Sequence, residues 1–181
     1  MKFIICSDIH GDLAGARAAV NAFESEGADK LLILGDVLYH GPRNNLPDAY
    51  APKEVIELLN GYKDSIICVR GNCDAEVDQM VLSFPITSKT AYVYDGDVAM
   101  LMTHGHSYTV DNPPPLAAGD VMLCGHTHVP TFLQFGNGNH CINPGSVSIP
   151  KGESVRSYIV YEDRRFTLKD CNGNTLYEYE I

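Results

Sequence analysis

The sequence predicts a mixed α/β fold, because short apolar runs alternate with two helical segments in the first half and turn-linked runs follow in the second. The runs are typical of buried strands, since they are partly β-branched and are bounded by polar residues or glycine. They cover residues 2–6, 31–34, 66–69, 98–102 and 121–124. Alternation of strand and helix implies right-handed crossovers, so the first strands are expected to pair in parallel.

Two helices are predicted from the spacing of apolar residues and from the residues that begin each helix. Between Leu13 and Phe23 apolar residues recur at helical spacing, and Asp12 precedes them as an N-cap. Between Pro52 and Leu59 a first-turn proline precedes a second apolar stripe. We also expect Asp74 to cap a helical segment over residues 75–80.

Turn signals indicate antiparallel hairpins in the second half. Asp95-Gly96, residues 136–138 and Asn172-Gly173 are typical turns, and short strands are predicted at 158–161, 165–168 and 175–179. The chain has 181 residues, of which 45% are hydrophobic and 20% charged. This composition is typical of globular proteins, and we expect a single domain spanning residues 1–181.

Charge and cysteine usage exclude several classes of protein. The formal net charge is −10, and the longest basic run is Arg164-Arg165, so we expect no general nucleic-acid binding and no membrane partner. The apolar run at residues 3–6 is too short for a signal-peptide core. The six cysteines form no C-x-x-C pair, which argues against a zinc finger or a disulfide framework. We expect a cytoplasmic location.

Side chains of the types that commonly bind metal ions follow each of the five apolar runs. Because functional sites of open α/β sheets gather at the carboxyl ends of strands, we expect these side chains to converge. His40 and His140 do not occupy such positions. The residues that do are Asp8, His10, Asp36, Asn72, Cys73, Asp74, His104, His106, His126 and His128.

The donor types predict a centre with two divalent ions. In Asp8-x-His10 and His126-x-His128 the spacing lets both side chains lie on one side of an extended segment. Carboxylate, imidazole and amide donors without thiolate suit Mn²⁺, Fe²⁺ or Zn²⁺ in a five- or six-coordinate site. The candidate ligands are too many for one small ion, whereas two ions roughly 3.5–4 Å apart, sharing a carboxylate, would use them all.

These motifs resemble those of the calcineurin-like metallophosphoesterase family. The resemblance rests on Asp8-x-His10, Gly35-Asp36, Gly71-Asn72-x-Asp74, the glycine-flanked His104 and Gly125-His126-x-His128. Residues 143–146 resemble the small cytosolic members, and residues 41–44, 70–74 and 145–152 resemble their bacterial phosphodiesterases. The resemblance implies a four-layer αββα sandwich, two mixed β-sheets flanked by helices, with the metal site at its edge.

The resemblance also implies how the ligands divide between the ions. Asp36 would bridge them. The first ion would be bound by Asp8, His10 and His128, and the second by Asn72, His104 and His126.

The implied activity is that of a metal-dependent phosphodiesterase acting on a small phosphodiester. A metal-bridging hydroxide would attack phosphorus in line, with Mn²⁺ as the expected metal and Fe²⁺ or Zn²⁺ as alternatives. The expected catalytic residues are Asn72, Cys73, His104 and His106. The expected substrate contacts are Arg43, Cys73 and His106. Arg43 is either a guanidinium for the phosphate or a solvated loop arginine, and His106 either faces the substrate, supports a ligand or is simply exposed.

Cys73 departs from the wider family, which commonly has histidine at this position. That histidine is thought to stabilise the transition state or to protonate the leaving oxygen. Here the proton would come from Cys73, His106 or water, or no proton would be supplied. We therefore expect phosphodiesters with good leaving groups to be preferred over alkyl monoesters.

Two alternatives remain open from the sequence. The retromer subunit of this fold resembles these enzymes and works as a scaffold, so a non-catalytic metal-binding or protein-interaction module is the first. A cyclic-nucleotide or nuclease-type diesterase is the second, with Tyr39, Tyr50 and Tyr108 as candidates for stacking a base. A homo-oligomer formed through the hairpins after Ser157 is a further expectation.

Overall fold

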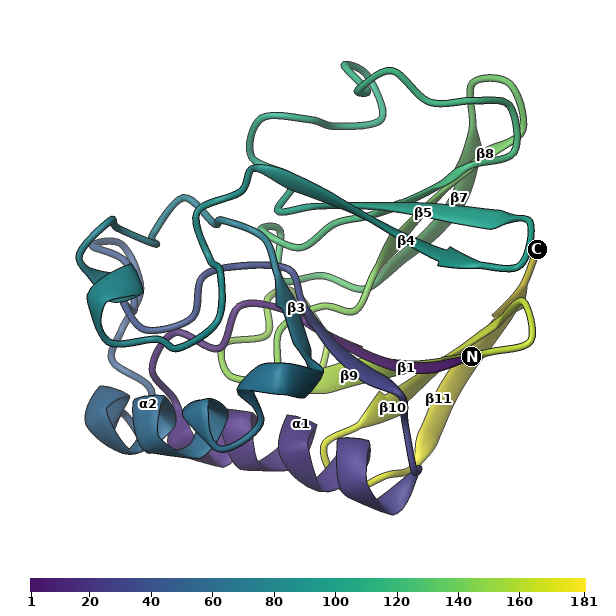
Figure 1. Cartoon of the computed structure of the whole chain (residues 1–181). Coiled ribbons are helices and arrows are strands. Elements are labelled where there is room, and N and C mark those ends of the chain that lie inside the picture. Colours follow the sequence, from purple (N-terminus) through teal and green to yellow (C-terminus); the bar gives the residue numbers. More distant parts are fainter.

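Two β-sheets pack face to face in the computed structural model, which describes all 181 residues (Figure 1). The six-stranded sheet has the order β11-β10-β9-β1-β2-β3, and the five-stranded sheet has the order β4-β5-β6-β8-β7. The six-stranded sheet consists of β1 (Lys2–Cys6), β2 (Lys30–Ile33), β3 (Ile66–Cys68), β9 (Ser157–Glu162), β10 (Arg165–Asp170) and β11 (Thr175–Glu180). The five-stranded sheet consists of β4 (Thr90–Asp95), β5 (Val98–Thr103), β6 (Val121–Leu123), β7 (Thr131–Phe135) and β8 (Asn139–Asn143).

Strand pairing confirms the mixed α/β fold. β1, β2 and β3 pair in parallel through the helical crossovers, and β9 then joins the free edge of β1 antiparallel. In the other sheet β5, β6 and β8 are parallel, while β4 and β7 pair antiparallel at the two edges. The hairpins predicted at Asp95-Gly96, at residues 136–138 and at Asn172-Gly173 all form.

The core is divided into two parts by the alternation of side chains along the strands. In β1, Phe3 and Ile5 belong to the buried cluster between the sheets, whereas Ile4 and Cys6 belong to the cluster beneath the helices. Both faces of the central strands are therefore buried. This double burial is why these segments read as continuous apolar runs in the sequence.

The outer face of the six-stranded sheet is covered by two helices, α1 (Leu13–Ser25) and α2 (Pro52–Asn60) (Figure 1). The predicted N-cap is confirmed, since the Asp12 side chain accepts a hydrogen bond from the Gly15 amide at 2.7 Å. α1 extends two residues beyond its predicted end and α2 extends one. The predicted strand ends also shift by one or two residues, as is usual where strands run into loops.

The outer face of the five-stranded sheet is covered by the loop of residues 104–120 rather than by a helix (Figure 1). Val110 and Leu116 of this loop pack against Met122 and Cys141 of the sheet. The two-sheet sandwich implied by the resemblance is thus confirmed, and its fourth layer is irregular chain.

The predicted helix over residues 75–80 is wrong, and so is the predicted role of Asp74. Between β3 and β4 the only helical element is the single 3₁₀ turn η2 (Asp78–Met80), and the other 3₁₀ turn, η1 (Lys63–Ser65), precedes β3. The Ala75 amide donates to Asp78, not to Asp74. Asp74 is buried, and its carboxylate accepts amide hydrogen bonds from other loops instead.

All six cysteines are free thiols, in agreement with the absence of a disulfide framework. None of the helices combines the length and the apolar character that crossing a membrane requires.

Candidate metal centre

The seven predicted metal ligands converge at one edge of the sandwich. Asp8 and His10 follow β1, Asp36 follows β2, and Asn72 follows β3. His104 follows β5 of the other sheet. His126 and His128 follow β6. Residues up to 120 positions apart in the chain are therefore brought together by the carboxyl ends of strands from both sheets.

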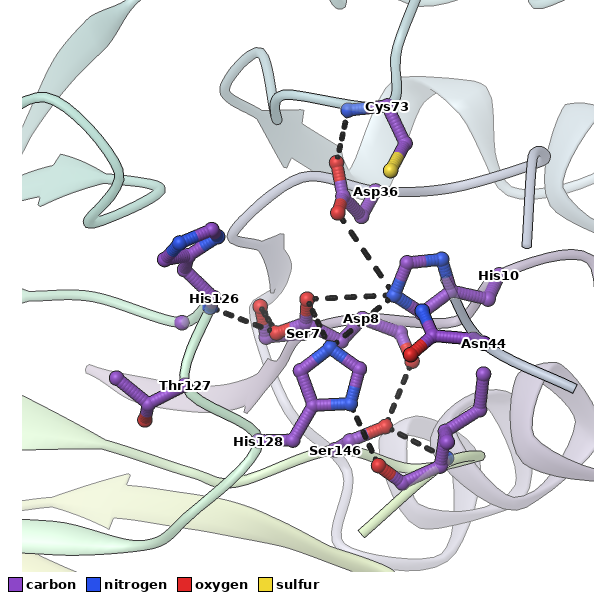
Figure 2. A network of polar contacts seen from close by, with 12 residues as sticks. Ser7, Asp8, His10, Asp36, Asn44, Cys73, His126, Thr127, His128 and Ser146 are labelled. Atoms are coloured by element: carbon purple, nitrogen blue, oxygen red, sulfur yellow. Dashed lines mark hydrogen bonds and ion pairs between the residues drawn. The ribbon is translucent and has the colours of Figure 1, made fainter. Parts of the chain in front are cut away.

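Asp8, His10 and His128 form the first cluster of donor atoms. Asp8 Oδ1 lies 3.2 Å from His128 Nε2 and 3.5 Å from His10 Nε2, and the two imidazole nitrogens are 3.3 Å apart. Figure 2 shows the two rings pointing toward one another beside Asp8. One carboxylate oxygen and two ring nitrogens thus surround a single small volume.

Asp36 connects this cluster to a second one. Its Oδ2 lies 3.7 Å from His10 Nε2 and 3.4 Å from His104 Nε2. His104 Nε2 in turn lies 3.0 Å from Asn72 Oδ1. The half-buried His126 ring completes this side, with its centroid 5.2 Å from that of His104. Asp36 is therefore placed to contact two neighbouring ions.

Three of the imidazoles are held by backbone carbonyl groups. The Nδ1 atoms donate to the oxygens of Tyr39 (for His10), Leu34 (for His104) and Ile149 (for His128). Because Nδ1 is the donor to the backbone, each ring turns its Nε2 into the site, where this atom can bind a cation once it has lost its proton. This orientation by an outer hydrogen bond is typical of metal-binding histidines.

Backbone strain is concentrated at the candidate ligands. Five of the seven adopt positive φ angles between 51° and 67°, namely Asp8, His10, Asp36, His126 and His128. Non-glycine residues rarely adopt this left-handed conformation, which costs on the order of 1–3 kcal/mol each. The surrounding structure must hold these residues in place, and such clusters of strain are typical of functional sites.

Hydrogen bonds to Asp8 come from several segments. The Ser146 and Ser148 hydroxyls both donate to its backbone oxygen at 2.8 Å. Its Oδ2 accepts from the Ser7 hydroxyl at 2.7 Å and from the His126 amide at 2.9 Å. Figure 2 shows the contacts that Ser7, His126 and Ser146 make with Asp8. Its other oxygen, Oδ1, is buried and makes no hydrogen bond.

Asp74 plays the corresponding part for Asp36. Its carboxylate accepts from the amides of Asp36, Val37 and Gly71 at 2.7–2.8 Å and so fastens the loop after β2 to the loop after β3. Gly71 packs so closely on Asp36 that a Cβ atom there would overlap the carboxylate. Gly125 packs in the same way against Ser7 and Asp8.

The electrostatics of the site favour ionised carboxylates. Burial by itself raises the pKa of Asp8, but the facing imidazoles of His10 and His128 outweigh it and lower that pKa below its ordinary value. For His104, burial opposes the charged form, yet Asp36 and Asp8 raise its pKa to about 9. The site is therefore a negative pocket that attracts positive charge.

These features fit the divalent ions that the fold family implies. The buried Asp8 Oδ1 has no protein partner and faces two imidazole nitrogens, an arrangement that a cation would satisfy. The donors are carboxylate, imidazole and amide, which suit Mn²⁺, Fe²⁺ and Zn²⁺. Cys73 Sγ also lies close to His10 and Asp36, so one thiol is available at the margin of the site.

A cavity of about 340 Å³ opens over the candidate ligands. Arg43 and Cys73 are among the residues that line it, whereas His106 is exposed, with its ring centroid 5.4 Å from that of His104. Lys151, to which the sequence reasoning gave no role, also lines the cavity. His40 and His140 lie outside it, as expected.

Sequence reasoning missed the groups that support the ligands. These are Ser7, Asp74, Asn143, Ser146, Ser148 and Lys151. The segment 143–152 contains four of them, and its similarity to the family was the available signal. Nothing in the sequence alone shows which loop a buried serine or aspartate will hold.

Comparison with known proteins defines the class. Residues 1–164 match the calcineurin-like phosphoesterase superfamily domain, and the chain belongs to this family. Membership implies divalent metal ions at the site. The curated phosphodiesterase YfcE of Escherichia coli K12 is 50% identical over 158 residues, which cover 87% of this chain and 85% of that protein.

Solved structures support the same assignment. The structure of the E. coli phosphoesterase YfcE superimposes with a TM-score of 0.96 and 43% identity, covering all of both chains. Vacuolar protein sorting 29 from Cryptosporidium parvum superimposes with a TM-score of 0.62 and 18% identity, covering 99% of this chain and 98% of that one. The second likeness shows a shared fold alone.

We predict that Asp74→Asn destabilises the protein and weakens metal binding. The Asp74 carboxylate accepts hydrogen bonds from three backbone N–H groups. Asparagine has one acceptor oxygen and one NH₂ donor, so its NH₂ group would face at least one of these N–H groups. We expect a loss of about 2 kcal/mol in the free energy of unfolding and a loss of about tenfold or more in Mn²⁺ affinity. Urea unfolding and metal titration measure the two effects.

Asp78→Asn is the matched control, because Asp78 accepts one amide hydrogen bond at an exposed turn. It should change stability by less than about 0.5 kcal/mol. Equal effects of the two substitutions would contradict the role assigned to Asp74.

Proposed function

We propose that the protein hydrolyses small phosphodiesters at a dinuclear metal centre. The observation that carries this proposal is the convergence of seven donor side chains at one edge of the sandwich, where Asp8 Oδ1 makes no hydrogen bond and Asp36 lies between two clusters. The 50% identity to a phosphodiesterase over most of the chain supports it. In this assignment Asp8, His10 and His128 would hold one ion, Asn72, His104 and His126 would hold the other, and Asp36 would contact both.

The ions supply, when bound, an activated water and charge neutralisation at the phosphate oxygens. The chain supplies two cationic side chains in the same cavity, Arg43 and Lys151. A guanidinium and an ammonium facing one cavity hold and orient a phosphate by charge-assisted hydrogen bonds. Lys151 is positioned through its backbone amide, which donates to the His128 oxygen at 3.2 Å.

The leaving group receives little help from an acid in this site. Burial, together with the nearby Asp36 carboxylate, raises the pKa of the Cys73 thiol to about 12. Such a thiol is a weak general acid at neutral pH. Burial and the neighbouring His104 lower the pKa of His106, so its imidazole is neutral. We therefore assign the enzyme to diesters whose leaving groups depart without protonation.

Several finer assignments belong to the same proposal. We infer that Mn²⁺ is the working metal, with Fe²⁺ and Zn²⁺ as alternatives, because the donor set is of mixed N and O type. The six free thiols support a reducing, cytoplasmic location. We propose that residues 1–181 act as one domain, that the net charge of −10 disfavours nucleic acid, and that the exposed strand β11 contributes to a homo-oligomer.

We predict that bis(4-nitrophenyl) phosphate is hydrolysed in the presence of Mn²⁺ and that chelation abolishes turnover. His104→Ala should lower kcat/KM by at least about 100-fold, because it removes a ligand that neighbours both Asn72 and Asp36. His140→Ala is the matched control, since His140 lies outside the cavity and contacts Tyr179. The absorbance of released 4-nitrophenolate measures turnover by wild type in Mn²⁺, by wild type in chelator and by each of the two variants.

Wild-type protein that binds Mn²⁺ and turns over no phosphodiester would contradict the proposed activity. It would support the scaffold alternative instead. Wild-type activity that persists in chelator would contradict the metal dependence.

We predict that Cys73→His raises turnover of a diester with a poor leaving group by about tenfold or more, because an imidazole can protonate the departing oxygen. Turnover of the bis-aryl substrate should change little. Cys73→Ser is the matched control and should preserve bis-aryl turnover. Loss of that turnover in Cys73→Ser would show that the thiol itself is required.

A further inference from the structure

A second cavity opens from the rim of the metal cavity. The two share Pro42, Arg43, Asn72 and Cys73 in their linings, so they adjoin one another. The second cavity has a volume of about 720 Å³ and extends away from the ligands over Tyr39, Arg70, Asp74, Ala75 and Glu76. We call it the side groove. A phosphodiester carries two ester arms, and the metal cavity alone gives no reason for either arm to be recognised.

Tyr39 is the one aromatic side chain in the side groove, and its backbone is tied to the metal site. Its carbonyl oxygen accepts a hydrogen bond from His10 Nδ1 at 2.7 Å. The residue is 42% exposed, and its ring rests edge-on against the ring of His40, with centroids 4.8 Å apart. A candidate ligand and an exposed aromatic surface are thus held in a fixed relation.

The charges of the side groove favour a neutral occupant. Arg43 and Arg70 contribute two positive charges and Glu76 contributes one negative charge, while the buried Asp74 carboxylate is already paired with three backbone amides. Arg70 is held in place because its Nε donates to the Asp74 backbone oxygen at 3.2 Å. A second phosphate would meet carboxylate as well as guanidinium, whereas an uncharged aromatic ring can lie against Tyr39 and the guanidinium groups without desolvating an unpaired charge.

The other aromatic candidates do not serve this purpose. Tyr50 packs edge-on against His40 with centroids 5.5 Å apart. Neither Tyr50 nor Tyr108 lines the metal cavity or the side groove. Of the three tyrosines named as candidates for stacking a base, only Tyr39 therefore lines a cavity beside the metal site.

We propose that the side groove receives a neutral aromatic ester arm of the phosphodiester and that the ring of this arm stacks on Tyr39. The proposal rests on the proposed function, because it places the phosphate in the metal cavity. Tyr39 is then a residue that determines substrate specificity. The favoured substrate class is a phosphodiester with an aryl or heteroaromatic group on one arm.

Phenylphosphonate and methylphosphonate test this proposal, because their C–P bonds are not hydrolysed and they differ in the arm alone. Binding to the Mn²⁺-loaded protein is measured by calorimetry. Wild type should bind phenylphosphonate about tenfold more tightly than methylphosphonate, because one aromatic stacking contact increases affinity by about this factor. Tyr39→Ala should abolish this preference without changing methylphosphonate affinity, and Tyr39→Phe should retain it.

Tyr94→Ala is the matched control, because Tyr94 is 59% exposed on β4 and lines neither cavity. An unchanged preference in Tyr39→Ala, or no preference in wild type, would overturn the side-groove proposal while leaving the proposed function intact. Failure of wild type to bind either phosphonate would contradict phosphate binding in the metal cavity, and the side-groove proposal would fall with it.

Discussion

The buried, unpartnered Oδ1 of Asp8 is the constraint on which the rest of the site depends. Leaving such an acceptor unsatisfied costs about 1–3 kcal/mol, and more for a charged group. The strained φ angles of five candidate ligands add further cost. A divalent cation would offset these costs, since Asp8 and the nearby imidazoles would hold it and it would satisfy the unpartnered carboxylate oxygen. The apoprotein therefore holds a preorganised negative site that metal binding completes.

The same atoms join the two halves of the fold. Asp8 follows β1 of the six-stranded sheet, and its side chain accepts from the amide of His126, which follows β6 of the five-stranded sheet. Ser146 and Ser148 reach its backbone from the segment between β8 and β9. Asp74 fastens the loop after β3 to the loop after β2. The same hydrogen bonds therefore stabilise this edge of the sandwich and fix the geometry of the candidate metal centre.

Much of this architecture could be predicted from the sequence. The buried strands, both helices and the seven candidate ligands are visible there because apolar runs end in Asp, Asn and His at regular places. The role of Asp74 could not be predicted, because a carboxylate that caps a helix and one that binds amides of distant loops look alike locally. Lys151 and the loop layer of residues 104–120 depend on tertiary packing, which local patterns do not encode.

Anomalous diffraction from crystals of the Mn²⁺-loaded protein, recorded on either side of the manganese absorption edge, tests the central claim most directly. We expect two manganese positions in the cavity, about 3.5–4 Å apart, with Asp36 between them and Asp8 Oδ1 bound to one. A single position, or two positions that Asp36 does not bridge, would contradict the dinuclear assignment. Manganese bound elsewhere and absent from this cavity would contradict the account as a whole.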